Sequence, residues 1–123
     1  MLFVESGKLP TFNGIGTVLE ATIKLDAGSN TKQSGKALCE ATGTVVLDMG
    51  TSTSVATVTV KVSGPGGPDR ASLVRLGPPI TRLTVPFVWE GEVTYGSPFT
   101  VKVDVDTNST LIVDSRVLRL MLR

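Results

Sequence analysis

Residues 98–106 read Pro-Phe-Thr-Val-Lys-Val-Asp-Val-Asp, and this stretch decides the fold class. Its apolar side chains stand at every second position, at Phe99, Val101, Val103 and Val105, with polar side chains between them. Successive side chains of a β-strand point to opposite faces of the sheet, so this alternation predicts a strand with one buried face and one solvated face.

The same period of two recurs along most of the chain. Valine and threonine, which both suit strands, number 17 and 16, and segments rich in Gly, Asp, Asn and Ser separate the alternating runs. We therefore predict an all-β fold: a single antiparallel β-sandwich, or a jelly-roll or barrel, of eight or nine strands. Jelly-roll and immunoglobulin-like topologies both fit this pattern. The predicted strands lie at residues 17–26, 37–49, 54–62, 72–76, 80–90 (continued by Val93 and Tyr95), 98–106, 110–114 and 116–122.

Some segments depart from the alternation. Residues 1–16 are interrupted by Gly and Pro and predict an irregular N-terminal arm, ahead of a β-sandwich domain over residues 17–123. Residues 63–70, Ser-Gly-Pro-Gly-Gly-Pro-Asp-Arg, predict a loop. Gly43 interrupts an apolar row, where we expect a bulge or a bend between sheets. Pro86 cannot donate a ladder hydrogen bond, so its strand is expected at a sheet edge or to be bulged.

The composition excludes several functional classes. The 123 residues carry 12 Lys and Arg against 11 Asp and Glu, and the scattered charges offer no basic patch for nucleic acid. The chain has no histidine and one cysteine, which excludes Ser-His-Asp and Cys-His nucleophiles, most zinc sites and an internal disulfide. We expect no enzymatic activity, no cofactor or metal, and no nucleic-acid or membrane partner. The first residues lack the basic and long apolar regions of a signal peptide, so we expect synthesis in the cytoplasm.

One cluster of acids and aromatic residues is a candidate ligand site. Glu90 and Glu92 flank Gly91 between Trp89 and Tyr95. A carbohydrate site combines a ring for stacking with an acid for the sugar hydroxyls. However, Trp89 and Tyr95 share the inner parity of their strand, which favours a place in the core for both.

A second set of residues is a candidate protein interface. All six arginines lie at or after residue 70, and arginine is enriched at interfaces. The C-terminal segment, residues 116–123, is apolar on one face and runs to the last residue. Either it is a central strand covered on both faces, or it pairs with another subunit. The interface candidates are Arg116, Leu118, Arg119, Leu120, Leu122, Arg123, Arg70 and Arg75.

In size, composition, strand pattern and flanking arm, the chain resembles the small β-sandwich virion proteins of tailed bacteriophages, such as capsid decoration or cement proteins and some tail modules. The resemblance implies a non-enzymatic structural protein located in the virion. Most such proteins are homo-oligomers, with a trimer favoured, and bind the major capsid protein or another virion protein on the outer head surface. Two further interpretations stay open: a receptor- or carbohydrate-binding module of a tail fibre or adhesin, and another cytosolic β domain.

Overall fold

The computed structural model describes residues 2–6, 12–24 and 35–122, and the regular structure in these residues is β-strand. They contain no helix that is long and apolar enough to span a membrane. The strands are β1 (Leu2–Ser6), β2 (Phe12–Lys24), β3 (Lys36–Asp48), β4 (Ala56–Ser63), β5 (Arg70–Leu76), β6 (Arg82–Thr94) and β7 (Pro98–Leu122).

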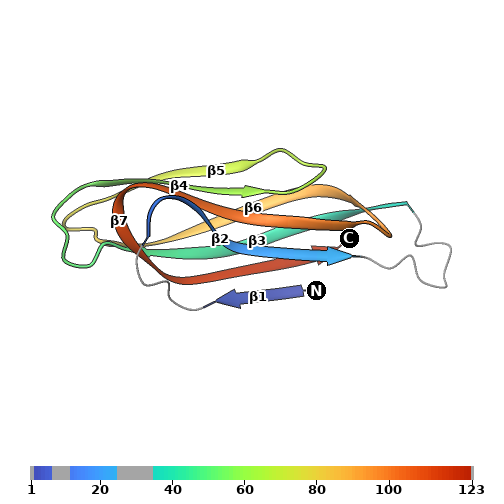
Figure 1. Cartoon of the computed structure of the whole chain (residues 1–123), viewed down its shortest axis with the longest axis horizontal. Helices are drawn as coiled ribbons and strands as arrows, with labels where there is room; N and C mark the ends of the chain where they lie inside the picture. The colour runs from blue at the N-terminus through green and yellow to red at the C-terminus, as the bar shows by residue number, and fades with distance from the viewer. Residues whose placement is uncertain (1, 7–11, 25–34, 123) are drawn as a thin grey trace.

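The long strand β7 organises the fold because it belongs to two layers. Its N-terminal part pairs with β2 and β4, and its C-terminal part pairs with β3 and β1, all antiparallel. Strand β5 extends the first layer beyond β4, and β6 extends the second beyond β3. Figure 1 shows β7 turning back at one end of the molecule, so that the two layers face each other.

The two layers form a nearly closed antiparallel barrel of six strands, β2 to β7, with β1 paired beside the C-terminal part of β7. The sheet order is β5-β4-β7-β3-β6, so β5 and β6 are the edges that meet where the barrel would close. The predicted all-β antiparallel class is confirmed, and so is the edge position of the strand that contains Pro86.

The core follows the alternation read from the sequence. Val101, Val103 and Val105 are fully buried, and Trp89 is 1% exposed. Valines from β4 meet them, because Val58, Val60 and Val62 are also inaccessible to solvent. Burying a side chain of this size stabilises the fold by about 1.5–3 kcal/mol, so these rows are the main source of stability.

The predicted number of eight or nine strands is wrong, because residues 98–122 form one strand of 25 residues. Asp114 is an extra residue in β7, since Val46 is opposite Ser115 while Leu47 is opposite Val113. This bulge switches the inward parity from Leu111 and Val113 to Arg116 and Leu118. A bulge and a break between strands both interrupt the alternation of side chains, so the sequence pattern does not distinguish them.

The predicted irregular arm over residues 1–16 is also wrong where the structure describes it. Leu2–Ser6 pair with Arg116–Leu120 of β7, and β2 begins at Phe12. Gly14 suggested irregularity, but the glycine has another explanation. It has φ +87° and lies at a register shift within β2. Residues 7–11 lie outside the described part of the chain.

Gly43 causes neither a bulge nor a bend, because the pairing of β3 is regular through it. A Cβ at this position would lie 1.9 Å from the Val117 carbonyl oxygen and 2.5 Å from Cζ of Phe87. Phe87 is directly opposite Gly43 in β6, and its ring covers the glycine. Glycine is therefore required here by the close approach of β7 and the aromatic ring.

Candidate functional site

Strands β5 and β6 follow one another in the chain, yet no ladder joins them within residues 35–122. Among the described residues, backbone hydrogen bonds cross the gap only at its two ends, in the turn after β5 and from the loop before β5. Gly77 and Ile80 exchange two bonds of 2.7 Å across the connecting turn. At the other end, the N–H of Glu92 donates to the carbonyl of Gly66 with an N···O distance of 3.1 Å. Between these two ties the barrel stays open, and we call this opening the β5–β6 seam.

The end bonds fix which backbone groups face the seam. Backbone N–H and C=O groups of successive residues point to alternate edges of a strand. Since Gly77 bonds across to Ile80 and Glu92 bonds toward Gly66, the odd-numbered residues of β5 and the even-numbered residues of β6 direct their backbone into the seam. Between the two ties, these residues are Ala71, Leu73 and Arg75 on β5 and Arg82, Thr84, Pro86, Val88 and Glu90 on β6.

The residues at the seam explain why it does not close. If the pairing of Gly77 with Ile80 continued, Arg75 would lie opposite Arg82 and Ala71 opposite Pro86. Arg82 is already paired with Asp48 and Asp114, so the Arg75–Arg82 pair does not account for the opening. Pro86 has no N–H, so it would leave the Ala71 carbonyl without its ladder partner. The Ala71–Pro86 pair therefore opposes the ladder that would complete the barrel.

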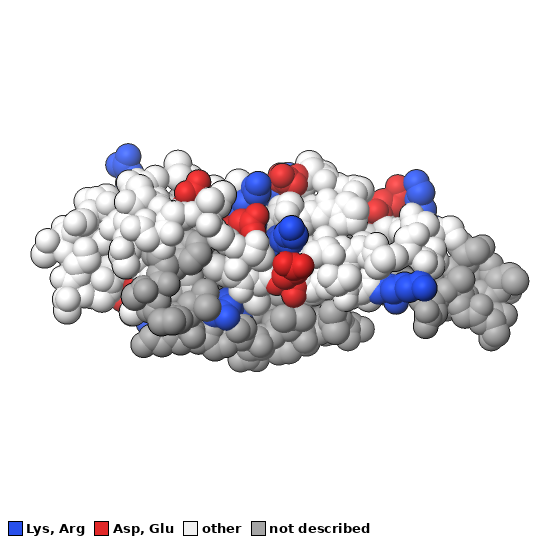
Figure 2. Space-filling view, in the orientation of Figure 1, with Lys and Arg blue, Asp and Glu red and all other residues white. Residues whose placement is uncertain are grey.

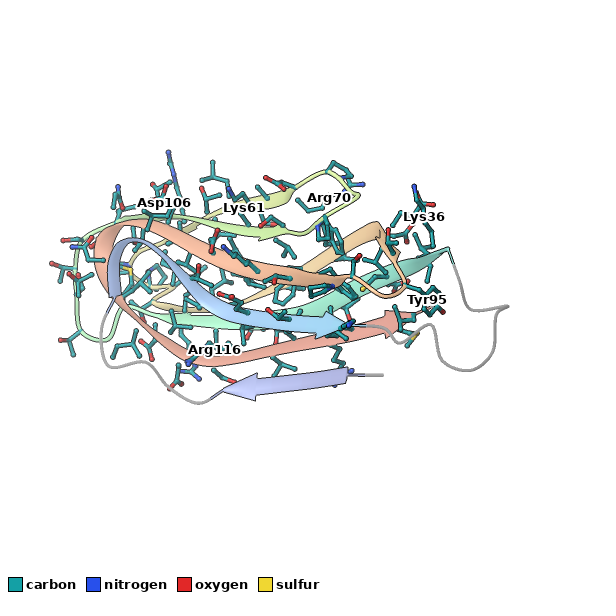
Figure 3. The ribbon with its side chains drawn as sticks, turned by 45° about the vertical axis from the view of Figure 1, so that its right-hand side comes forward. Lys36, Lys61, Arg70, Tyr95, Asp106 and Arg116 are labelled. Carbon is teal, nitrogen blue, oxygen red and sulfur yellow. The ribbon has the colours of Figure 1, made fainter. Side chains whose placement is uncertain are left out.

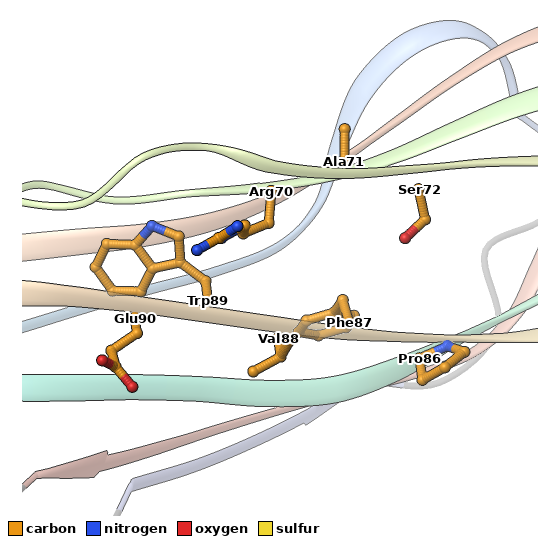
Figure 4. A pocket seen from close by; sticks show the side chains of 8 residues that line it. All are labelled: Arg70, Ala71, Ser72, Pro86, Phe87, Val88, Trp89 and Glu90. Atoms are coloured by element: carbon orange, nitrogen blue, oxygen red, sulfur yellow. The ribbon is translucent and has the colours of Figure 1, made fainter.

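A groove of about 540 Å³ occupies the seam, and Figure 4 shows it from close by. Arg70, Ala71 and Ser72 line it from β5, and residues 86–90 line it from β6. Its volume lies within the range of ligand-binding sites in proteins, about 300–1,000 Å³. The groove thus joins Arg70, a candidate interface residue, with Trp89 and Glu90, two candidate ligand residues.

Two hydrogen-bond donors line this groove without an acceptor. The Nε1 atom of Trp89 is buried and has no hydrogen-bond partner. In the described part of the chain, Arg70 is in none of the ion pairs, and its neighbour Asp69 pairs with Lys61 at 4.0 Å. Figure 4 shows the side chain of Arg70 extending toward the indole of Trp89. An unpaired buried donor is rare in a folded protein, so this end of the groove is complementary to an acceptor.

The loop over residues 64–69 packs tightly on β6 at the end of the seam. A Cβ at Gly64 would lie 2.7 Å from the Trp89 ring, and one at Gly67 would lie 2.2 Å from the Glu90 carbonyl oxygen. Gly66, at φ +72°, brings its own carbonyl to the Glu92 N–H. The Gly-Pro-Gly-Gly-Pro sequence therefore allows the loop to pack directly on Trp89 and on the backbone of Glu90.

The outer rim of the seam is apolar. Leu73 on β5 is 71% exposed and Val88 on β6 is 56% exposed. Both residues direct their backbone groups into the seam. Unpaired strand edges with exposed apolar side chains are surfaces that folded proteins normally cover.

The predicted ligand cluster is divided by the 64–69 loop. Glu90 lines the groove in the seam, whereas Glu92 lines a second hollow of about 450 Å³ on the other side and pairs with Lys36 at 3.7 Å. Tyr95 is partly buried against the core, at the end of the molecule that carries Lys36 (Figure 3). Trp89 is buried, so it offers no exposed ring for stacking on a sugar.

The predicted interface residues do not form one surface. Figure 3 places Arg70 and Arg116 at opposite edges of the molecule. Leu118 and Leu120 are core residues, and the segment that contains them is a central strand between β3 and β1, so an interface through these two side chains is excluded. Arg119, Met121 and Leu122 are exposed near the end of β7, and Arg123 lies outside the described residues. Arg75 is exposed on β5 beside the seam.

Two arginines have pKa values shifted in opposite directions. Burial lowers the pKa of Arg116, which is 8% exposed. Hydrogen bonds to Asp114 and then Asp48 raise the pKa of Arg82, which pairs with both carboxylates at 2.5 and 3.0 Å. Arg82 thereby ties β6 to β3 and β7. On the face in Figure 2, charges of both signs alternate, with no stripe of one sign.

The other chemical groups of the described residues are dispersed. Cys39 is completely buried, and desolvation raises the pKa of its thiol. No three His, Cys, Asp or Glu side chains gather there in a way that could hold a metal ion. In comparisons with known proteins, no family model matches the chain, and no match is found among the curated proteins.

Sequence reasoning missed the seam itself. Pro86 predicted an edge strand, but the neighbour that this edge faces depends on the path of the whole chain. One usable signal was present: Ala71 and Pro86 are equally spaced about the turn centre between Pro78 and Pro79. A hairpin with this turn pairs Ala71 with a proline, which cannot donate to its carbonyl.

Proposed function

We propose that the chain is a non-enzymatic structural protein of a virion, which decorates the outer surface of a tailed-bacteriophage head and partners the major capsid protein or another virion protein. The resemblance in size, composition and strand pattern motivates this proposal. The observation that carries it is the β5–β6 seam, an exposed apolar surface with two unpaired strand edges. Such a surface suits binding to another protein, and its two free edges are backbone groups that a partner can pair with.

A decoration protein is expected to act in many copies on a symmetric lattice. We therefore propose a homo-oligomer, with a trimer favoured, and we regard the two facing layers as a β-sandwich of the kind found in such proteins. The oligomer is tested by light scattering on a sizing column. A closed oligomer supports assembly before binding, whereas a monomer at high concentration contradicts the proposed trimer.

The function is tested on purified particles. Phage particles released from cells that make the protein are banded twice and washed, and mass spectrometry counts the chain against the capsid protein. We expect a fixed ratio between the two, with immunogold labelling on the head surface. An abundant host protein, counted in the same sample, measures carry-over. If the chain falls to the carry-over level, the proposed function is wrong.

The alternative of a carbohydrate-binding module has less support from the structure. Its predicted stacking residue, Trp89, is buried, and Glu90 and Glu92 lie on opposite sides of the 64–69 loop. Binding on a glycan array, abolished by Glu90→Gln in a folded variant, would favour this alternative over decoration.

A further inference from the structure

We propose that the β5–β6 seam binds a short extended segment of a partner protein, which adds as a strand to the β5 edge and places an acidic side chain beside Arg70 and Trp89. This inference rests on the proposal that the chain works by binding another protein. It adds the mode of binding and the chemistry of the segment that is recognised.

The backbone geometry favours β5 as the edge to which the segment adds. Ala71, Leu73 and Arg75 direct their N–H and C=O groups into the seam, and none of them is a proline. The opposite edge is interrupted at Pro86, which cannot donate. Residues 71–75 span about 13 Å at ~3.3 Å per residue. A segment of about five residues therefore suffices to use the free groups of β5, by the strand addition that many peptide-binding domains use.

The side chains indicate the chemistry of the segment. Leu73 and Val88 flank the seam on its outer face, so outward residues of the added strand would pack between apolar side chains. On the inner side, Trp89 Nε1 and the Arg70 guanidinium are donors that lack an acceptor within the described residues. A carboxylate accepts from both and balances the arginine charge. Arg70 is exposed and can swing away from the indole to admit it.

The test uses a synthetic peptide of eight residues, capped at both ends, in which valine and threonine alternate around one central aspartate. Three comparison ligands separate the contribution of the carboxylate from that of the backbone ladder. They are the same peptide with asparagine for aspartate, the same peptide N-methylated at alternate amides, and N-acetylaspartate amide. Trp89 is the one tryptophan of the chain, so its fluorescence reports binding at the groove directly. Calorimetry provides the affinity.

We expect the aspartate peptide to bind about five- to tenfold more tightly than the asparagine peptide. This is the difference expected when one neutral hydrogen bond becomes charge-assisted. The N-methylated peptide and N-acetylaspartate amide should not bind, because neither can form the ladder. Arg70→Gln should remove the preference for aspartate. The matched control is Arg75→Gln, the same substitution on the same strand at a residue that does not line the groove, and it should keep the preference.

A third variant, Leu73→Pro, removes one seam-facing donor. The N–H of residue 73 points into the seam and away from β4, so the pairing of β5 with β4 should stay intact. It should abolish peptide binding with an unchanged circular dichroism spectrum. If this variant fails to fold, the N-methylated peptide supplies the same information from the ligand side. The inference is overturned if no peptide changes the fluorescence or heat, if the N-methylated peptide binds equally, or if Arg70→Gln keeps the preference. Self-association that Leu73→Pro abolishes would also overturn it, because the occupant would then be a second copy.

Failure of this inference is distinguishable from failure of the proposed function. If the wild-type chain is present on purified particles and Leu73→Pro binds them equally well, the decoration function stands and the strand-addition mechanism is wrong. If the chain binds the aspartate peptide but is absent from particles, the seam is a peptide site and the proposed virion function is wrong.

Discussion

Closing the β5–β6 seam by substitution is the sharpest test of why it is open. We predict that the variant Pro86→Thr is more stable than the wild type. Pro86→Thr would supply the N–H that the Ala71 carbonyl lacks, so that β5 and β6 could pair in the register set by Gly77 and Ile80. Strand β5 can then pair with β6 along its length.

The expected gain follows from the pairs that would form. The register set by Gly77 and Ile80 adds three hydrogen-bonded pairs, at positions 75, 73 and 71 of β5, and each pair exchanges two hydrogen bonds. Each net hydrogen bond is worth about 0.5–1.5 kcal/mol, because water solvates the open edges in the wild type. Loss of the proline increases the entropy of the unfolded chain and costs about 0.4–1 kcal/mol. Allowing for the cost of ordering β5 against β6, we expect a net gain of about 2 kcal/mol. For 123 residues this is about 8 °C in melting temperature.

Calorimetry measures the stability, and hydrogen exchange followed by NMR measures the seam directly. The amides of Leu73 and Thr84 should exchange quickly in the wild type and slowly in the Pro86→Thr variant. Pro98→Thr is the matched control, because it loses a proline at the start of β7 without gaining a seam partner. A Pro86→Thr variant that melts at or below the wild-type temperature, with both amides still exchanging quickly, would refute the explanation from Pro86.

Three further predictions concern the glycines and the cysteine. Gly67→Ala places a Cβ 2.2 Å from the Glu90 carbonyl oxygen, so we expect the free energy of unfolding to fall by about 2 kcal/mol and the Glu92 amide to exchange rapidly. Gly77→Ala is the control: its Cβ would meet a valine side chain at 3.2 Å, so it should destabilise the protein less. Gly43→Ala should lose about 3 kcal/mol in urea unfolding, because two central strands must separate. The Cys39 thiol should react with Ellman's reagent only after unfolding. Burial raises its folded pKa above the ordinary 9.0, so stability should fall as pH rises above 9.0, and Cys39→Ala should make that fall shallower.

The alternation of side chains was sufficient to predict which residues form the core. Trp89, Val101 and Val103 were all placed on inner faces from parity alone, and each is buried. Burial with a period of two is a local property of a strand, so it can be read in a window of a few residues. The class of fold follows from the same local signal.

Pairing partners are not local, and the sequence-based predictions failed there. Residues 98–122 were divided into three strands because residues 106–109, Asp-Thr-Asn-Ser, favour a turn and because the parity changes at Asp114. Strand β3 nevertheless continues to pair on both sides of the bulge at Asp114. Residues 2–6 were assigned to an irregular arm, since five residues carry too little pattern to indicate that they pair with β7. In both places the neighbouring strand decides the structure, and a single segment does not contain that information.

The candidate site shows the same limit. Arg70 and Trp89 stood in two different hypotheses, one for an interface and one for a ligand, because they are distant in sequence and have no shared motif. The structure brings them into one groove through two unrelated features. A glycine-rich loop packs on β6, and the β5–β6 hairpin does not pair along its length.

The residue that keeps the seam open also helps to make it selective. An open edge that any strand can join leads to aggregation, and a proline on one side limits this by removing a donor. With Pro86 on β6, an added strand is restricted to the β5 side, where Arg70 favours an acidic segment over a second basic edge such as β5 itself. Pro86 prevents the barrel from closing on itself, and Arg70 disfavours pairing between two β5 edges, so the seam stays open to a segment of opposite charge.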